Sequence, residues 1–483
     1  MSCGPEYERD DAKVGRGPWD ARVQFVTDSR GRAFAYRPHQ LITVRGALPA
    51  LAALLGLVAV SEKAVHPIFG PKSDDQLVLV RGLPNPLELA RRLRAQGFRS
   101  RPNHVFFAAA IGSGAAVGAP NPGGFPNPGG FPNPGGFPNP GGFPNPAYGG
   151  GHCDCSSPCG PAGYQAQAPR RSSAVASPSP SKGEQPFRQP AAGTCNILVV
   201  DTGVNPNIKP PETTSSSFSV SATEARMQLA AVDPSSDPDP WDDDKNRLLD
   251  PFSGHGTFIA GLLARLAPGA KITVDGKMTS YGDTDDAMIA EALVARFHDS
   301  ASPPFDIVSM SFSGFSEDDD PPLALSGAIS HIQSKYRTAE ELESDDILGE
   351  RVVFVAAAGN DSTCRPTWPA TFESVISVGA VGPEGPAWFT NFGPWVQAAA
   401  PGVDIISTFF DLTDERARDE GADFDGWAQW SGTSFSAPIV AAEIAWEWMT
   451  RGSAGTVGET ATWLLQRKAL YRYPWLGTVV NTC

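Results

Sequence analysis

The sequence predicts an α/β fold in which a parallel sheet carries helices on both faces, preceded by a small α+β unit. From residue 196 onward, apolar strand-like runs alternate with segments of helical periodicity, the pattern of parallel strands joined by crossover helices. Residues 22–109 contain a separate, shorter series of strands and helices. Residues 113–190 are rich in Pro and Gly and divide the two regions.

Composition and charge bound the class of protein. The 483 residues are 41% hydrophobic, enough for one large and one smaller domain. Residues 1–112 contain 16 Lys and Arg against 10 Asp and Glu, whereas residues 196–483 contain 18 against 41. These opposite net charges favour docking of the first region on the second. The acidic main region argues against nucleic acid as a partner, which needs a basic surface.

The start of the chain, MSCGPEYERDDAKVG, has neither the basic start nor the apolar stretch of a secretory signal. The longest apolar run, residues 47–60, is too short to span a bilayer. We therefore expect no membrane partner and a cytoplasmic location. Three of the seven cysteines lie in HCDCSSPC, residues 152–159, whose spacing matches no common zinc site. We expect free thiols or an adventitious disulfide there rather than a metal.

After a tail of residues 1–20, residues 21–112 form the small unit. Residues 22–46 read as two strands joined by a turn at Asp28 to Gly31, followed by a helix over 47–60. A strand over 76–82, an amphipathic helix over 85–98 and a strand over 104–109 complete it. We expect a small α+β domain of the ferredoxin-like class.

The dividing segment, residues 113–190, contains PNPGGF four times between Pro120 and Phe143. Its period of six with paired glycines excludes collagen. Pro prevents helix and sheet pairing and Gly adds freedom, so we expect a disordered, flexible linker with a typical span of roughly 50 Å. The alternative is that its regularly spaced Phe residues dock on a partner.

Residues 191–483 form the main domain. The predicted elements alternate along the chain: strands at 196–201, 271–276, 305–313, 351–359 and 374–381, and helices at 256–267, 285–297 and 322–336. In such a sheet, ligands bind beyond the carboxyl ends of the strands. Polar residues at strand ends and helix starts are therefore the candidates for a site.

Four polar residues occupy such positions. Asp201 ends the first strand, His255 begins a helix between two glycines, Asn360 follows a later strand, and Ser434 precedes an apolar helix. Each alone has an ordinary explanation: a local turn bond, a core histidine, a turn residue and a helix cap. Together they supply a nucleophile, its base, an orienting carboxylate and an oxyanion donor. The helix N-terminus behind Ser434 adds positive potential.

The motifs DTG at 201–203, HGT at 255–257 and GTSFSAP at 432–438 resemble those of the subtilisin-like serine peptidases, the subtilases, over about residues 195–450. The order Asp, His, Ser also separates the chain from chymotrypsin-like enzymes. The resemblance implies that Asp201 orients the general base His255, that Ser434 is the nucleophile, and that Asn360 binds the oxyanion. It implies protein or peptide substrates and no cofactor for the chemistry.

The resemblance also implies a strand that pairs with substrate at 309–314 and a wall of the primary specificity pocket at 356–359. The expected substrate-binding residues are Ser311, Phe312, Ser313, Gly314, Ala357, Ala358 and Gly359. Many members have Leu and Gly at the positions of Phe312 and Ser313. We therefore expect a shallower or more polar pocket.

The small unit resembles the propeptide domains of subtilases, which implies autoinhibition with residues 102–110 lying product-like in the cleft. Two alternatives are a partner-sensing adaptor and a non-catalytic scaffold whose site is permanently plugged. The acidic stretches 233–250 and 316–322 could hold structural calcium, as in many family members. They lack EF-hand spacing, so we expect solvated loops, which would favour basic substrates.

Overall fold

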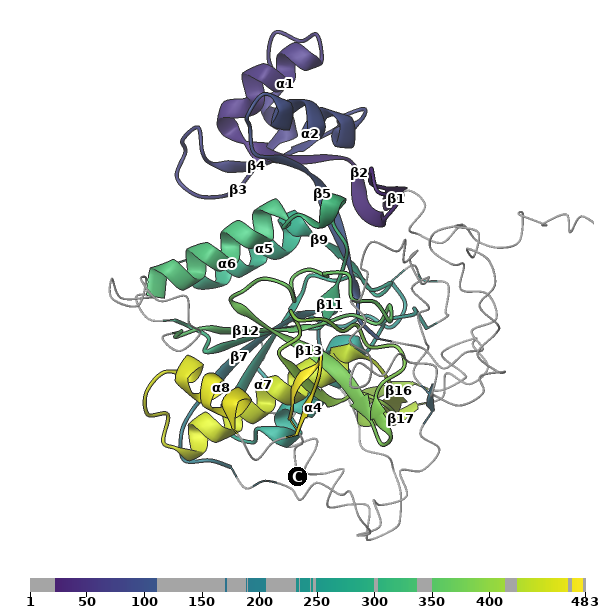
Figure 1. Cartoon of the computed structure of the whole chain (residues 1–483), viewed down its shortest axis with the longest axis vertical. Helices are drawn as coiled ribbons and strands as arrows, with labels where there is room; N and C mark the ends of the chain where they lie inside the picture. The colour runs from purple at the N-terminus through teal and green to yellow at the C-terminus, as the bar shows by residue number, and fades with distance from the viewer. Residues whose placement is uncertain are drawn as a thin grey trace, which may run out of the picture.

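The computed structural model of the chain describes residues 22–110, 170–171, 188, 190–205, 232–233, 235–243, 245, 249–298, 303–336, 350–412, 424–467 and 471–480. The PNPGGF repeat and the HCDCSSPC stretch lie outside the described residues. Figure 1 shows a small N-terminal unit seated on a larger body, with helices α5 and α6 next to it.

The N-terminal unit is built around an antiparallel sheet. Its elements are β1 (Gln24–Thr27), β2 (Ala33–Val44), α1 (Leu48–Leu54), β3 (Val65–Phe69), β4 (Leu77–Arg81), α2 (Pro86–Ala95) and β5 (Ser100–Ala108). The strands lie in the order β5-β2-β4-β3, every neighbouring pair antiparallel. This order, with one helix after β2 and one after β4, is the ferredoxin-like arrangement.

Two details of this unit differ from the sequence prediction. The helix expected over 47–60 ends at Leu54, because Gly56 adopts a φ of +68° that a helix cannot continue. Leu57 and Val58, which follow, are 52% and 106% exposed. Strand β3 was not predicted, since it contains Pro67, which an interior strand does not tolerate. It lies at the edge of the sheet, where the missing donor costs little.

The N-terminal unit packs on two helices of the main body, α5 (Asp286–Phe297) and α6 (Leu323–Tyr336). The helices contribute small side chains to the same buried cluster as β2 and β4, namely Ala287, Ala290, Ala324 and Ala328. A methyl group on Gly327 would lie 2.7 Å from Phe69 Cζ. Small residues on α5 and α6 therefore permit this close approach.

The main body contains the predicted parallel sheet. Its strands are β7 (Asn196–Asp201), β8 (Lys271–Gly276), β10 (Ile307–Met310), β12 (Val353–Ala357), β13 (Val375–Gly382), β15 (Ala398–Pro401), β18 (Arg472–Tyr473) and β19 (Gly477–Val479). They lie in the order β18-β19-β15-β13-β12-β10-β7-β8, and all neighbours from β19 to β8 are parallel. The short β14 (Gly385–Pro386) pairs with β13.

Helices cover both faces of this sheet, as predicted. In Figure 1, α5 and α6 lie on one side, and α4 (His255–Leu266), α7 (Thr433–Thr450) and α8 (Val457–Gln466) on the other. Among the described residues, no helix has the length and apolar character needed to cross a membrane. A separate antiparallel sheet joins β16 (Ile405–Leu412), β17 (Phe424–Trp430) and β6 (Arg170–Arg171).

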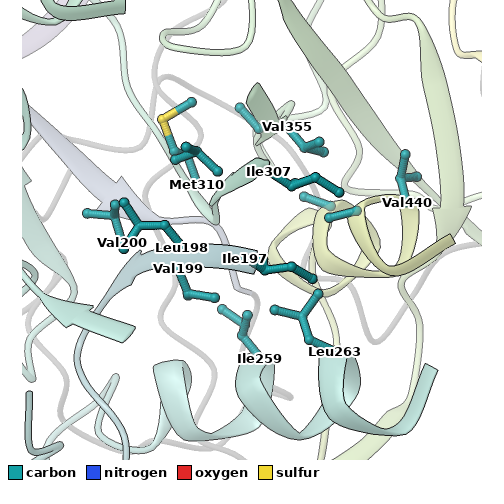
Figure 2. Packing of buried hydrophobic residues seen from close by; sticks show 14 of the residues in the cluster. Ile197, Leu198, Val199, Val200, Ile259, Leu263, Ile307, Met310, Val355 and Val440 are labelled. Atoms are coloured by element: carbon teal, nitrogen blue, oxygen red, sulfur yellow. The ribbon is translucent and has the colours of Figure 1, made fainter. Parts of the chain in front are cut away.

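The core lies between the central strands and the helices. Strand β7 is buried on both of its faces, as expected for a central parallel strand. Figure 2 shows its side chains and those of β10 meeting α4 and α7, with the labelled residues Ile197, Leu198, Val199, Val200, Ile259, Leu263, Ile307, Met310, Val355 and Val440. This packing fixes the carboxyl ends of β7 and β12 and the N-termini of α4 and α7 around one rim.

Arginines of the N-terminal unit hold the acidic loop, which we define as residues 316–320. Glu317 has no exposed side-chain surface and accepts hydrogen bonds from Arg91 Nε at 2.6 Å and Arg94 Nη2 at 2.7 Å. Its backbone N–H donates to Nε2 of the buried His104 at 3.2 Å. Asp320 pairs with Arg101 at 2.5 Å. These ion pairs join basic side chains of the N-terminal unit to acidic side chains of the main body.

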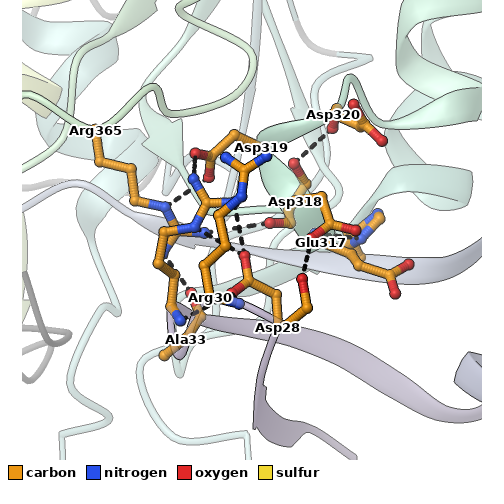
Figure 3. Close-up of polar contacts among 12 residues, drawn as sticks. Asp28, Arg30, Ala33, Glu317, Asp318, Asp319, Asp320 and Arg365 are labelled. Carbon is orange, nitrogen blue, oxygen red and sulfur yellow. Dashed lines mark hydrogen bonds and ion pairs between the residues drawn. The ribbon is translucent and has the colours of Figure 1, made fainter. Parts of the chain in front are cut away.

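A second group of contacts surrounds Asp319 (Figure 3). Arg32 and Arg365 both bind its carboxylate, Arg365 through Nε at 2.6 Å. Arg365 Nη1 also donates to the Ala33 carbonyl at 2.6 Å, joining main body to N-terminal unit. The prediction of a solvated loop over 316–322 is wrong for Glu317 and Asp319, because arginines of the N-terminal unit and Arg365 of the main body supply the counter-charges.

Candidate active site

The first two predicted residues meet at the carboxyl edge of the sheet. Asp201 ends β7 and His255 begins α4, and both are fully buried. His255 Nδ1 lies 2.7 Å from Asp201 Oδ1, which also accepts the Thr202 N–H at 2.8 Å. The carboxylate therefore fixes the orientation of the imidazole ring and leaves Nε2 for chemistry.

Aromatic rings and a glycine fix the position of His255. The rings of Phe252, Trp430 and Phe435 lie with their centroids 6.1, 5.5 and 5.6 Å from the imidazole. Gly254, just before the helix, has a φ of +82°, and a side chain there would collide with the Phe409 ring. The ring is thus packed on several sides as well as held by Asp201.

Ser434 lies in the first turn of α7, after Gly432. Its backbone N–H donates to the Ala109 carbonyl at 2.9 Å, and its Oγ donates to the Ser311 carbonyl at 2.8 Å. The hydroxyl is therefore bonded to Ser311 rather than to the imidazole of His255. A rotation about the Cα–Cβ bond would free it, and catalytic hydrogen bonds often form only in the reacting complex.

Asn360 follows β12 and reaches the start of α7. Its Oδ1 accepts the Thr433 N–H at 3.0 Å and the Thr433 hydroxyl at 2.9 Å. These bonds fix the amide so that Nδ2 is a free donor. Among the described residues, Asp201 Oδ2, His255 Nε2 and Asn360 Nδ2 are buried atoms without a hydrogen-bond partner. Two of them are the base and an oxyanion donor that the sequence predicts.

Residues 105–109 of the N-terminal unit occupy the predicted substrate groove. Strand β11 (Phe312–Ser313) pairs with β5 in antiparallel register, Phe312 with Ala108 and Ser313 with Phe107. Ala109 N–H donates to the Ser311 carbonyl at 3.1 Å. This pairing explains why the strand predicted over 305–313 breaks after Met310, since β10 belongs to the main sheet and β11 to the groove.

The other predicted substrate-binding residues surround the same groove. Gly314 exchanges backbone hydrogen bonds with Trp368 at 3.0 and 2.9 Å. Ala357 ends β12, and Ala358 and Gly359 continue from it, all three buried. Gly359 has a φ of +100° and its N–H donates to the Thr433 hydroxyl at 3.1 Å. The first predicted segment thus pairs with β5, and the second reaches the start of α7.

Sequence reasoning missed the other rim of the groove. The short β9 (Asp283–Asp285) pairs with Val105 to Phe107, and the Gly282 carbonyl accepts the Ala108 N–H at 2.8 Å. Strand β5 thus lies between β9 and β11. The sequence marks this rim only by Gly282, a residue type common in turns. In the structure its φ is +79°.

Asp239 was also missed, because it lies in an acidic stretch that predicts a solvated loop. It is 5% exposed and holds the start of α4. Its Oδ2 accepts the Thr257 hydroxyl at 2.8 Å, and its Oδ1 accepts the Gly254 N–H at 3.2 Å. Burial raises the pKa of Asp239 to about 7, and the charge of Asp201 adds to the rise.

In the stretch 233–250, Asp237 also has protein partners. Asp237 binds the Gly276 N–H at 2.9 Å and Lys277 Nζ at 3.1 Å. Within the part of the chain described, no group of three or more His, Cys, Asp or Glu side chains could hold a metal ion. Of the seven cysteines, Cys195 and Cys364 are described; Cys195 is a buried free thiol and Cys364 is half-buried. The other five lie outside the described residues.

Comparisons with known proteins identify the family of this part of the chain. The model of the Subtilase family matches residues 194–467. A thermophilic serine proteinase of Bacillus sp. (strain AK1) is 29% identical over 201 residues, 39% of this chain and 41% of that protein. An extracellular basic protease of Dichelobacter nodosus is 30% identical over 225 residues, 43% and 33% of the two chains. The matched stretches thus span less than half the length of these relatives.

One solved structure with a similar arrangement is that of a cold-adapted subtilisin-like serine proteinase. It is 21% identical, with a TM-score of 0.42, and covers 60% of this chain and 89% of that chain. A lanthipeptide protease has a TM-score of 0.43 at 16% identity, over 60% of this chain and 85% of that one.

The relatives correct one prediction, and the family match assigns the chain. The predicted cytoplasmic location is wrong: the Dichelobacter nodosus relative and a halolysin-like protease of Natrialba magadii are both named as extracellular. The first residues of this sequence do not decide the location.

The family match covers more than half of the 483 residues and includes Asp201, His255, Asn360 and Ser434. The chain therefore belongs to the subtilase family of serine peptidases.

Proposed function

We propose that the chain is a serine endopeptidase that hydrolyses peptide bonds through Asp201, His255, Asn360 and Ser434. The observation that carries the proposal is the 2.9 Å hydrogen bond from the Ser434 N–H to the Ala109 carbonyl, beside the unpartnered Asn360 Nδ2. A carbonyl in this position is where an oxyanion would develop during attack by the hydroxyl.

The proposed reaction proceeds in two halves. Ser434 Oγ leaves the Ser311 carbonyl, gives its proton to His255 Nε2 and bonds to the substrate carbonyl carbon. The Ser434 N–H and Asn360 Nδ2 stabilise the oxyanion, and Asp201 stabilises the imidazolium. His255 then protonates the leaving amine, so that the peptide C–N bond breaks and an acyl-enzyme remains. A water molecule, deprotonated by His255, then attacks the acyl carbon; the ester bond to Ser434 Oγ breaks, His255 returns the proton to that oxygen, and the acid is released.

Two substitutions test the roles separately. In subtilisin, loss of the nucleophile or base costs on the order of 10⁶-fold in turnover, and loss of one oxyanion donor roughly 10²- to 10³-fold. We expect Ser434→Ala to abolish casein-peptide hydrolysis and labelling by a fluorophosphonate probe. Asn360→Ala should lower kcat with KM nearly unchanged. Turnover by Ser434→Ala comparable to that of the wild type would refute the assignment.

We also propose that residues 21–112 form an internal inhibitor, joined by residues 113–190 to a catalytic domain of residues 191–483. The tail of β5 pairs with β9 and β11 on both sides, and Ala109 contacts Ser434. A methyl group on Gly432 would lie 2.5 Å from the Ala109 oxygen and 2.7 Å from Ala110 Cα. This closeness supports a cleavage position at the Ala109–Ala110 bond.

Mass spectrometry of the purified chain tests this cleavage. We expect wild-type protein to divide between Ala109 and Ala110, while Ser434→Ala stays at 51.0 kDa. The alternative of a permanently plugged scaffold is favoured by one observation, the bond from Ser434 Oγ to Ser311 instead of to His255. An intact wild-type chain that no fluorophosphonate labels would establish that alternative.

A further inference from the structure

The register of the occupied groove fixes which side chains face the primary specificity pocket, the space between residues 311–314 and 357–359. Directly paired residues of antiparallel strands carry their side chains on the same face, and residues two apart on a strand share a face. Ser313 pairs with Phe107, so its side chain lies on the face of Phe107 and Ala109. The opposite face holds Phe106 and Phe312, whose rings are 5.8 Å apart.

The side chain of Ser313 extends from the first wall of this pocket, residues 311–314, toward the second wall, residues 357–359. A methyl group on Gly359 would lie 2.9 Å from Ser313 Oγ and closer still to the Asn391 amide nitrogen. The hydroxymethyl group therefore fills the space between the two walls where a longer substrate side chain would have to enter. A glycine at position 313 would leave that space open.

The far side of the pocket cannot move back to compensate. The Thr367 hydroxyl donates to the Ala358 carbonyl at 2.6 Å, and Asn391 Nδ2 donates to the same carbonyl at 2.9 Å. Thr367, Asn391 and Ala358 are all 0% exposed. Two hydrogen bonds thus fix the second wall, and the backbone bonds between Gly314 and Trp368 fix the first.

We infer that Ser313 restricts the residue before the cleaved bond to Ala, Gly or Ser. This inference rests on the proposed peptidase function and names the substrate class of the same site. The chain itself has Ala109 in this position, 3% exposed, followed by Ala110. The excluded residues are large apolar and aromatic ones, such as Leu and Phe.

Matched chromogenic peptides test the inference on the full chain. Phe-Phe-Ala-Ala-p-nitroanilide and Phe-Phe-Ala-Phe-p-nitroanilide differ only in the residue before the cleaved bond. The ratio of their kcat/KM values does not depend on how much enzyme is in its open form. We expect wild type to favour the Ala peptide at least roughly 10-fold, the scale at which a hydrophobic pocket discriminates side-chain size.

Substitutions at position 313 should move this ratio in both directions. We expect Ser313→Gly to reduce the preference for Ala by roughly 10-fold or more, and Ser313→Thr to strengthen it. Ser313→Ala should lie between wild type and Ser313→Gly, and it replaces the glycine variant if that fails to fold. A wild-type ratio near one, or a ratio that these variants leave unchanged, would overturn the inference while fluorophosphonate labelling upheld the peptidase. Absence of both labelling and hydrolysis would overturn both proposals.

Discussion

Glu317→Gln tests how much the ion pairs of the acidic loop contribute to attachment of the N-terminal unit. The glutamate is fully buried and accepts from both Arg91 and Arg94. Glutamine keeps the shape but removes the charge and one acceptor oxygen. Arg91 and Arg94 would then face a neutral amide, and the negative charge that compensates theirs in the wild type would be lost.

The magnitude follows from how exposed the partners are. Breaking a buried ion pair costs about 3–5 kcal/mol, whereas an exposed pair contributes about 0–1 kcal/mol. The side chains of Arg91 and Arg94 are 42% and 23% exposed, so water can partly replace the lost carboxylate. We therefore expect about 2 kcal/mol, between those limits. At about 1.4 kcal/mol for each factor of ten, this is roughly a 30-fold rise in the released population.

The assay is the rate at which a fluorophosphonate probe labels Ser434 in the full chain. The probe reaches the hydroxyl only when residues 107–109 leave the groove, so the initial rate measures the released population. The matched control is Asp320→Asn, whose carboxylate is 46% exposed and pairs with Arg101. We expect a rise below about 5-fold there. Equal rates for wild type and Glu317→Gln would refute the reasoning.

Two further predictions concern the catalytic rim. Burial raises the pKa of Asp239 from 3.8 to about 7. Between about pH 4 and pH 7, the folded chain therefore keeps a proton that the unfolded chain has already lost, and stability falls as pH rises through this window. Asp239→Asn should flatten that part of the curve of Tm against pH, followed by circular dichroism; an unchanged slope would contradict it. Gly432→Ala puts a methyl group 2.5 Å from the Ala109 oxygen. We expect kcat/KM for peptide hydrolysis to fall by about 10²-fold. An unchanged value would show that the substrate does not bind beside Gly432 as Ala109 and Ala110 do.

The residues that sequence could locate are those whose position follows from local rules. Asp201 and Asn360 end or follow apolar strands, and parallel strands bring their carboxyl ends to one edge. His255 and Ser434 begin helices whose apolar pattern is evident. For these four, the periodicity of strand and helix was sufficient to predict a shared rim.

The residues that sequence could not locate depend on partners far along the chain. Asp239 looks like a member of a solvated acidic stretch, yet it is buried because the N-terminus of α4 supplies its donors. Glu317 lies in a similar stretch, and its arginines come from α2, more than 220 residues earlier. Composition predicts that opposite charges attract, but only the packing of α2 against the loop decides which carboxylate becomes buried.

Cleavage after Ala109 would not by itself release the N-terminal unit. The bonds of Ala108 and Ala109 to Gly282, Ser311 and Ser434 all lie before the cleaved bond. The pairing of β5 with β9 and β11, and the ion pairs of Glu317, lie farther still from it. Hydrolysis therefore removes the covalent connection and leaves the docked surface unchanged. If the Ala109 carboxylate stays on the Ser434 N–H, release is governed by the arginine contacts, and screening them with salt should speed it.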